Sequence, residues 1–389
     1  MVKIELIYDI VILEVKSMLE VKHAKKIVKG KYRCIVISDI HSHLDRFKQL
    51  LEKVAYSRND YLVVLGDFVE KGDQAVETVE YLMELQRKSD KVYVLLGNCE
   101  YALEEMVNNP KYAKQVIHYL NNIGKGGMIR QAINKLSLNI KSAQPEFIQA
   151  KVKKILLPYF NYFNTLPTTL HFNNFIFVHA GIERRDDWQN SKLSSMIEMK
   201  TFYLEGHCLD EYVIVGHLPT SNQYKDSINN EIIIDNEKRI ISIDGGTGVK
   251  SISQLNALII YGDNDSYTFF KEFVQPLPLY QVLVDVNTSS KVPVKIAWPN
   301  FEVELIEEKN NFSKCRQVNT NRILNIKNEF LYQRNNKLYC LDDYIDYRIS
   351  LNKGDIVKLV GVYGTYAYVI KDNLVGWVKF RYLKKIMKL

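Results

Sequence analysis

From residue 34 to residue 41 the chain reads CIVISDIH, an apolar run that ends abruptly in a carboxylate and an imidazole. Four more apolar runs follow at 61–65, 92–96, 175–178 and 212–215, each rich in β-branched or aromatic residues. Runs of this length and composition are typical of strands buried inside a sheet. An Asp, Asn or His follows every run within two residues, which independent core strands would not be expected to share. The pattern predicts that the strand ends build a common site.

Amphipathic segments separate the first three runs. Residues 44–54 carry apolar side chains at positions i, i+3, i+6, i+7 and i+10, and residues 73–88 repeat a helical period. Asp39 and Asp67 are 28 residues apart and Asp67 and Asn98 are 31 apart, the length of a β-α-β unit. Because right-handed crossovers bring the C-terminal ends of parallel strands to one edge of a sheet, we expect an α/β fold with its site at that edge.

The side chains at the strand ends are oxygen and nitrogen donors suited to a pair of divalent cations. Carboxylates lower the net charge of such a site, imidazoles bind borderline metals, and an amide oxygen ligates without adding charge. Two cations about 4 Å apart need a bridging carboxylate, and Asp67 suits that role. One Asp after a strand is more often a turn former or a helix cap, but six donors in one order favour a metal site. The predicted donors are Asp39, His41, Asp67, Asn98, His179 and His217.

Five sequence blocks carry a resemblance to a known family. They are Asp39-Ile40-His41, Gly66-Asp67 with Gly72, Gly97-Asn98-Cys99-Glu100, Val178-His179-Ala180-Gly181 and Gly216-His217. In this order they resemble the D-x-H, G-D-x-x-x-x-G, G-N-H-E/D, V-H-A-G and G-H blocks of the calcineurin-like metallophosphoesterases, over roughly residues 32–273. The most similar branch is that of phosphoprotein phosphatases and symmetrical dinucleoside tetraphosphatases. The resemblance implies an α/β fold, an αββα sandwich with a helical insert.

The resemblance also implies how the donors divide between two divalent ions. It places Asp39, His41 and Asp67 on one metal. It places Asp67, Asn98, His179 and His217 on the other. Manganese is the expected metal, with iron, zinc, nickel and cobalt as alternatives.

Two departures from the family pattern concern catalysis. Cys99 stands where the family has a histidine that helps to protonate the leaving group, and Glu70 stands where the phosphoprotein branch has the aspartate that orients it. A thiol is a poorer acid for this task than an imidazolium. Lys71 replaces an arginine, which keeps a positive charge for the phosphate but loses the bidentate fork. The residues expected to act in catalysis are Asp67, Asn98, Cys99, Glu70 and Lys71, and Arg184 and Arg185 are alternative phosphate clamps.

The expected activity is hydrolysis of a phosphate ester or anhydride by attack of a metal-bound water. The substrate is a phosphorylated protein or a nucleotide, including dinucleoside polyphosphates. Because the family histidine is missing, leaving groups that need little protonation should be favoured: nucleotide anhydrides, diesters and aryl phosphates over alkyl phosphoserine. The alternative is a catalytically weakened adaptor that keeps the fold and binds protein partners.

The chain is expected to divide into four segments. Residues 1–30 form an N-terminal extension, residues 31–274 the catalytic domain with a helical insert at about 101–171, and residues 275–320 a β-rich connector. Residues 321–389 carry short aromatic strands and a Gly376-Trp377-Val378 motif that resembles a small, all-β, bacterial SH3-like barrel. Trp377, Tyr366 and Tyr368 are candidates for a peptide or glycan groove there, although at least half of such aromatics are part of the barrel core.

Composition and charge indicate which partners the protein is expected to bind and in which cellular compartment it is expected to act. The 389 residues carry a formal charge of +7, and residues 354–389 hold seven basic and two acidic side chains, so an anionic or peptide partner of this last module is an alternative to a solvated face. The remainder is close to neutral and gives no strong nucleic-acid signal. Five scattered cysteines without a C-x-x-C pair fit a reducing cytoplasm. We expect no membrane span, because no apolar run approaches the roughly 18 residues that one needs.

Overall fold

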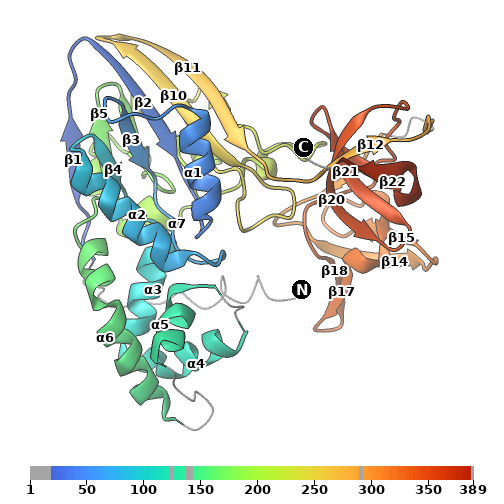
Figure 1. Cartoon of the computed structure of the whole chain (residues 1–389), viewed down its shortest axis with the longest axis horizontal. Helices are drawn as coiled ribbons and strands as arrows, with labels where there is room; N and C mark the ends of the chain where they lie inside the picture. Colours follow the sequence, from blue (N-terminus) through green and yellow to red (C-terminus); the bar gives the residue numbers. More distant parts are fainter. Residues whose placement is uncertain (1–18, 123–125, 137–142, 289–291, 387–389) are drawn as a thin grey trace. The chain divides into compact units, whose positions relative to one another are not determined.

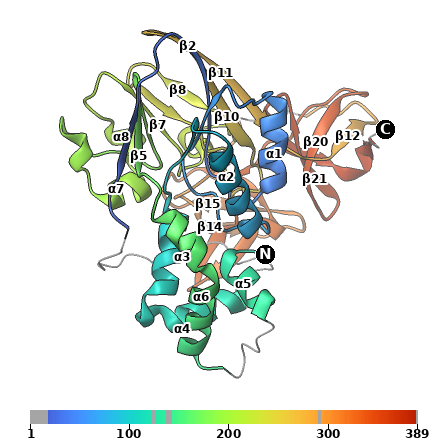
Figure 2. The ribbon, with the colours of Figure 1, turned by 60° about the vertical axis from the view of Figure 1, so that its left-hand side comes forward.

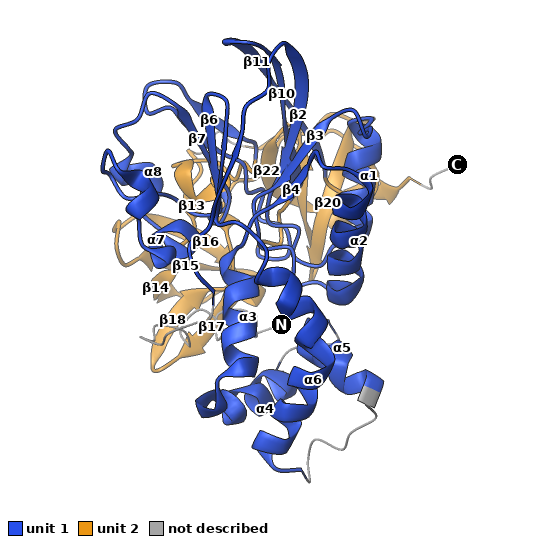
Figure 3. Cartoon of the chain, turned by 90° about the vertical axis from the view of Figure 1, so that its left-hand side faces the viewer, with its two compact units in different colours: residues 1–219, 231–249, 254–274 blue, residues 220–230, 250–253, 275–389 orange. Residues whose placement is uncertain are grey.

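The computed structural model describes residues 19–122, 126–136, 143–288 and 292–386. Most of the predicted N-terminal extension, residues 1–18, lies outside the described residues. The contacts divide the chain into two compact units (Figure 3). Unit 1 comprises residues 1–219, 231–249 and 254–274, and unit 2 comprises residues 220–230, 250–253 and 275–389.

Unit 1 contains two sheets, drawn in Figure 1. The six-stranded sheet has the order β1 (His23–Lys26), β5 (Thr169–Phe172), β6 (Phe175–Val178), β7 (Tyr212–Val215), β9 (Ile240–Ser242) and β8 (Ile233–Asp235). The five-stranded sheet has the order β11 (Ser266–Val274), β10 (Leu255–Asp263), β2 (Lys31–Ile37), β3 (Tyr61–Val64) and β4 (Val92–Val94).

Within each sheet the predicted strands run parallel. β2, β3 and β4 pair parallel to one another, and β6 pairs parallel to β7. The five predicted strands are therefore confirmed, and they divide between the two sheets, with β2, β3 and β4 in one and β6 and β7 in the other. β10 and β11 form an antiparallel hairpin, and Asn264 at its turn has a positive φ of 52°.

The alternation of side chains along the strands builds the layers of unit 1. Cys34 and Val36 of β2 point into a core that lies between the two sheets and includes Phe175 and Phe177 of β6. The neighbouring Ile35 and Ile37 point to the opposite face, where helices cover them.

Helices cover both outer faces of the two sheets. α1 (Leu44–Lys53) and α2 (Ala75–Lys88) cover the five-stranded sheet, and α7 (Leu193–Glu198) and α8 (Phe202–Glu205) cover the six-stranded one. The result is the predicted αββα sandwich.

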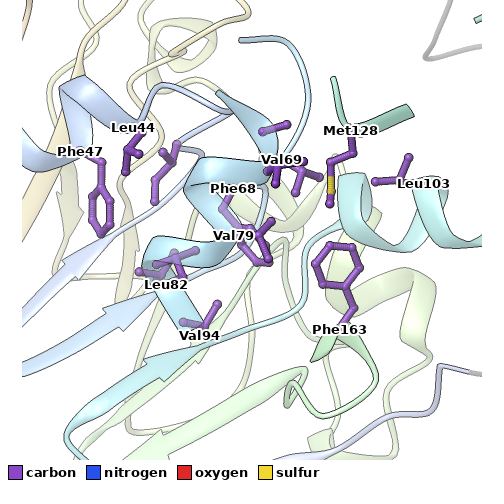
Figure 4. Close-up of a cluster of buried hydrophobic side chains, with 14 of the residues drawn as sticks. Leu44, Phe47, Phe68, Val69, Val79, Leu82, Val94, Leu103, Met128 and Phe163 are labelled. Carbon is purple, nitrogen blue, oxygen red and sulfur yellow. The ribbon is translucent and has the colours of Figure 1, made fainter. Parts of the chain in front are cut away.

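The helical insert comprises α3 (Asn98–Asn108), α4 (Ala113–Asn122), α5 (Met128–Leu136) and α6 (Pro145–Phe163). Both views of the ribbon place these helices together beyond one end of the sheets (Figure 1, Figure 2). Met128 and Leu103 of the insert pack beside Val69, which follows β3 (Figure 4). The helices end earlier than predicted, because 169–172 pair with β6 as a strand. Single 3-10 turns occur in unit 1 at Pro110–Tyr112 and Trp188–Asn190.

Unit 2 consists of short, antiparallel strands. One sheet has the order β22 (Leu374–Lys379), β21 (Tyr366–Lys371), β20 (Ile356–Tyr363), β12 (Leu279–Val282) and β23 (Leu383–Lys385). A second has the order β16 (Ile323–Lys327), β15 (Phe312–Gln317), β14 (Glu302–Glu307), β18 (Lys337–Cys340) and β17 (Leu331–Arg334), and β13 (Lys295–Ile296) pairs with β19 (Tyr344–Ile345). Its 3-10 turns are Thr220–Gln223, Asn328–Phe330 and Phe380–Tyr382.

Strands from the predicted connector and from the predicted last domain share both sheets of unit 2. β12 pairs with β20 and β23, and β14 pairs with β18. Trp377 and Tyr368 are each only 1% exposed and stack on one another inside the core, so they do not line a groove. An all-β module is present, and its assignment to the SH3-like class stays a prediction. None of the helices in the described ranges is long and apolar enough to cross a membrane.

Lys295 gives unit 2 a pH-dependent stability. Its ammonium is buried and donates to the carbonyl oxygens of Ser221 and Tyr224, and burial lowers its pKa from 10.5 to about 8. Between pH 8 and pH 10.5 the unfolded chain therefore binds more protons than the folded one, so this residue makes the free energy of unfolding rise with pH.

We expect the Lys295→Met variant to lose that rise, on the order of 2 kcal/mol. Urea unfolding of a Trp188→Phe background measures it, because the remaining tryptophans, Trp298 and Trp377, both lie in unit 2. The exposed Lys353→Met is the matched control and should keep the rise. Equal pH profiles in the two variants would contradict this account.

Candidate metal centre

The loops that follow β2 and β3 are bound to each other through their backbones. The N–H of Asp39 donates to the carbonyl of Gly66 over 3.2 Å, and the N–H of His41 donates to the carbonyl of Asp67 over 2.9 Å. Asp39, His41 and Asp67 all have positive φ, between 46° and 54°. Non-glycine residues adopt this region at a cost and persist in it where the surroundings enforce it, commonly at functional sites.

The first group of donors meets between these loops. His41 Nε2 lies 3.7 Å from Asp39 Oδ1 and 3.7 Å from Asp67 Oδ2. His41 Nδ1 faces the carbonyl oxygen of Val69 at 3.3 Å, which leaves Nε2 as the nitrogen with a lone pair toward the carboxylates. All three donors are buried, so no bulk water competes for them.

The second group of donors meets on the other side of Asp67. His179 Nε2 lies 3.4 Å from Asp67 Oδ1 and 2.9 Å from Asn98 Oδ1, and His217 Nδ1 lies 2.9 Å from the same amide oxygen. The carbonyl oxygen of Leu65 holds His179 Nδ1 at 2.7 Å and so fixes the ring. The six predicted donors therefore come together, and Asp67 lies between the two groups.

Two glycines make this approach sterically feasible. A Cβ at Gly97 would collide with the backbone nitrogen and the carboxylate of Asp67, and a Cβ at Gly216 would collide with Ser38 and the carboxylate of Asp39. Only glycine leaves room for the carboxylates at these two positions.

The site holds His41 and His217 neutral and its central carboxylate ionised. Burial lowers the pKa of His217 to about 3 and that of His41 well below its usual range. Burial raises the pKa of Asp39 to about 6, while the neighbouring His179, His41 and Lys71 bring the pKa of Asp67 below its usual range in spite of burial. At neutral pH all four side chains are in the deprotonated form that binds cations.

Two buried donor atoms lack a hydrogen-bond partner among the described residues, as expected of atoms that bind a metal ion. They are Asp39 Oδ1 and His217 Nε2, both shielded from solvent. A buried polar atom without a partner is costly, and a bound cation would relieve that cost. Donor atoms of Asp39, Asp67 and His179 lie within 4.8 Å of one another, and so do those of His41, Asp67 and Cys99. The residues present fit divalent cations of the borderline type.

Cys99 and Glu70 do not contact one another in the manner of the family dyad. Cys99 Sγ donates to Asp67 Oδ2 over 3.0 Å, and burial together with Asp67 raises the thiol pKa well above its usual value. The carboxylate of Glu70 accepts hydrogen bonds from the hydroxyl of Tyr119 and from the N–H of Met128. Glu70 thus binds the helical insert. The neutral thiol of Cys99 donates a hydrogen bond to the central carboxylate, that of Asp67.

The three predicted basic residues occupy different places. Lys71 Nζ lies 3.4 Å from His41 Nε2 and so points at the donors. Arg185 is bound in bidentate fashion by Asp187 at 2.6 and 2.9 Å and also by Glu183, and Arg184 is exposed beside it. The structure links Lys71 to the site, and a substrate role for the two arginines stays a prediction.

Glu100 is a supporting residue that the sequence reasoning left without a role. Its fully buried carboxylate accepts the backbone N–H groups of Gly97 and Asp67 on Oε2, each at 3.0 Å, and those of Phe68 and Val69 on Oε1 at 2.9 and 3.1 Å. Burial and Asp67 raise its pKa to about 8. The position of Glu100, three residues after Gly97, is a capping-box signal that could have revealed this role.

Asp244 is a second residue that the sequence reasoning missed. Its Oδ1 accepts the N–H of Gly246 at 2.7 Å, while Oδ2 is buried and lacks a hydrogen-bond partner among the described residues. Burial and the charge of Asp39 raise its pKa well above the usual range. Asp244 follows β9 in the same way that Asp39 follows β2, and this strand-end position was the available signal.

Residues 32–233 match the family model described as Calcineurin-like phosphoesterase. A symmetrical bis(5'-nucleosyl)-tetraphosphatase of Buchnera aphidicola subsp. Acyrthosiphon pisum is 43% identical over 63 residues, which cover 16% of this chain and 22% of that protein. A zinc-dependent endopolyphosphatase of Saccharomyces cerevisiae is 30% identical over 84 residues, covering 21% and 25%. The chain thus spans about a quarter of the length of these relatives.

Solved structures with a similar arrangement are distant in sequence. A putative diadenosine tetraphosphatase aligns with 65% of this chain and 98% of its own, at 16% identity and a TM-score of 0.41. A metallophosphoesterase from Sphaerobacter thermophilus aligns with 62% and 88%, at 16% identity and a TM-score of 0.35.

Glu100 provides a test of how the loops position the donors. In Glu100→Gln the side-chain NH2 group replaces one of the two acceptor oxygens and faces two of the four backbone N–H groups, which can no longer donate to it. The backbone around Asp67 therefore loses two of its hydrogen bonds and changes conformation. Supporting groups of this kind typically contribute 10–100-fold to metal affinity, and we expect a loss in that range for Mn²⁺ in equilibrium dialysis.

Glu104→Gln is the matched control, because Glu104 is a buried glutamate on the same helix that accepts from the side chains of Asn108 and Asn164. Circular dichroism checks that both variants fold. Metal affinities that agree within threefold would refute the positioning role of Glu100.

Proposed function

Because the chain belongs to the calcineurin-like phosphoesterase family, we propose that it is a dinuclear-metal-dependent phosphoesterase that hydrolyses phosphate esters or anhydrides. The observation that carries the proposal is the convergence of six donors from five strand ends around one ionised, buried carboxylate. Asp39, His41 and Asp67 would hold one divalent cation. The second would be held by Asp67, Asn98, His179 and His217.

Two bound cations of this kind lower the pKa of water toward neutrality and neutralise charge on the oxygens of a phosphoryl group. The chain's own residues would do the rest. Lys71 offers an ammonium beside the donors that can bind a phosphoryl oxygen. Glu100 and Leu65 hold the donors in position, so little reorganisation is needed when substrate binds.

The position of Cys99 limits the leaving groups. A half-buried thiol that already donates to Asp67 and has a raised pKa is a poor proton donor to a departing alkoxide. Glu70 is bound to Tyr119 and Met128 and so would not orient a proton donor at position 99. We therefore propose nucleotide anhydrides as the preferred substrates. Relatives described as a symmetrical bis(5'-nucleosyl)-tetraphosphatase and an endopolyphosphatase support this class.

Manganese is the proposed metal, with zinc as the principal alternative. The donor set of carboxylates, imidazoles and one amide oxygen accommodates both, and the yeast relative is described as zinc-dependent. An adaptor without activity is the second candidate, and Cys99 is the observation that favours it. Against it, two buried donor atoms would remain unsatisfied in a scaffold without metal.

Asp67→Asn separates the enzyme from the adaptor. Loss of the bridging charge should lower manganese-dependent hydrolysis of p-nitrophenyl phosphate at least a hundredfold, since both metal sites share this carboxylate. The exposed Asp45→Asn is the matched control and should retain the wild-type rate. Equal rates for Asp67→Asn and the wild type would favour the adaptor.

Cys99→His tests the account of the leaving group. We expect kcat/KM for an alkyl phosphate monoester to rise about tenfold, while that for the aryl ester changes little. The gain should stay at the low end of general acid catalysis, because Glu70 is bound elsewhere and cannot orient the new imidazole. Metal content by atomic emission is the control. If alkyl turnover does not rise while both metals stay bound, the explanation based on Cys99 is wrong.

A further inference from the structure

Arg348, in unit 2, has a guanidinium that two aromatic rings contact and that has no polar partner within the described part of the chain. Its central carbon lies 3.8 Å from the ring centre of Phe312 and 4.5 Å from that of Tyr366. The two rings meet edge to face at 4.9 Å and 86°, so the guanidinium lies against the corner that they form. Among the described residues it makes no hydrogen bond and no ion pair through its side chain.

The core of unit 2 holds this corner rigid. The ring of Phe312 packs on the buried Trp377 at 5.4 Å. The backbone of Arg348 forms a bridge with Trp377, and its carbonyl accepts the hydroxyl of Thr288 at 2.8 Å. The two rings contact the guanidinium, and its N–H groups have no protein acceptor among the described residues, so they are available to a planar oxyanion.

A cavity of about 600 Å³ opens in front of Arg348. A volume of this size is typical of sites for small molecules or for one end of a peptide. Apart from Phe312 its lining residues are polar, and besides Arg348 they include Lys309, Asn311 and Asn325. The amides can donate to or accept from a neutral polar group beside the charged one.

The charges around the cavity favour an anion with a single charge. Asp346 also lines it, but both of its oxygens already accept backbone N–H groups, from Val294 at 2.9 Å and from Asn325 at 3.2 Å. Lys309 is paired with Glu307 at 3.1 Å. Arg348 is therefore the main source of positive charge that faces a ligand, and Asp346 disfavours a dianion such as phosphate.

We propose that this cavity is a carboxylate-binding site, in which the fork of Arg348 holds the carboxylate in bidentate fashion and the asparagine amides bind an adjacent peptide-like group. The ligand class is an N-acylated amino acid or the C-terminal residue of a peptide. This site belongs to unit 2 and does not depend on the proposed phosphoesterase activity.

The test is a titration of the full-length, isotopically labelled chain with N-acetylglycine, followed by the backbone NMR signals of Asn311, Asn325 and Arg348. We expect saturable shifts of these signals in the millimolar range. N-acetylglycinamide, which lacks the charge, should bind at least tenfold more weakly. Inorganic phosphate should also bind more weakly than the carboxylate.

Three variants decide whether Arg348 is responsible. Arg348→Gln should raise the dissociation constant at least tenfold, and Arg348→Lys should raise it less, because the charge remains without the fork. Arg316→Gln is the matched control, since this exposed arginine on β15 pairs with Glu304 and lies outside the cavity lining. Signal dispersion reports folding; if Arg348→Gln does not fold, Arg348→Lys and the comparison of acid with amide carry the test.

Three results would overturn the proposal. They are an absence of shifts in the wild type, equal binding of acid and amide, and an affinity of Arg348→Gln equal to that of the wild type. Phosphate that binds these signals more tightly than N-acetylglycine would reject the assignment to a carboxylate.

Discussion

The carboxylate of Asp67 is the group on which the rest of unit 1 depends. It is buried, ionised and within 3.7 Å of both His41 and His179, so it can persist only if cationic partners or hydrogen bonds compensate its charge. The surrounding chain is arranged around this requirement. Glu100 holds the backbone of the loop, Gly97 leaves room for the carboxylate, and Cys99 donates to it from both its backbone and its side chain.

The backbone strain at the strand ends follows from the same requirement. In a strand that continued with extended geometry, Asp39 and His41 would share one face of the sheet, because side chains two residues apart point the same way; the positive φ at both residues shows that the chain leaves extended geometry here. A left-handed turn at each of these residues lets both side chains face Asp67. The sandwich supplies the rigidity that keeps the turns in place, since the strands that precede them are buried on both faces.

The helical insert is coupled to the site through Glu70. The hydrogen bonds from Tyr119 and Met128 to this carboxylate tie α4 and α5 to the loop that carries Asp67 and Lys71. The close approach of Gly126 to the backbone of Gly72 strengthens the same junction. A residue that a family comparison would assign to proton transfer thus serves to attach the insert, and the thiol of Cys99 is held by Asp67 and not by Glu70.

Much of unit 1 could be predicted from the sequence, because its strands, helices and strand-end residues are marked by patterns of neighbouring residues. The apolar runs predicted the five strands, the helical period between them indicated parallel pairing, and the polar residues after the runs predicted the six candidate donors that the fold brings together. The division into two sheets could not be predicted in this way, because strand pairing between distant segments depends on packing in three dimensions. The end of the insert was misjudged for the same reason, since 169–172 become a strand only through pairing with β6.

Other features depended on tertiary contacts that no local pattern encodes. The chemical types of Glu70 and Cys99 were visible in the sequence, but their partners lie 49 and 32 residues away and were revealed only by the fold. In unit 2, Trp377 and Tyr368 had the composition of a binding groove, and only the packing of two sheets showed that they form the core. The sequence by itself determined which residues are candidate donors, because donor type and strand spacing are local properties. The tertiary structure decided which of them meet, because burial and hydrogen bonding are properties of the whole fold.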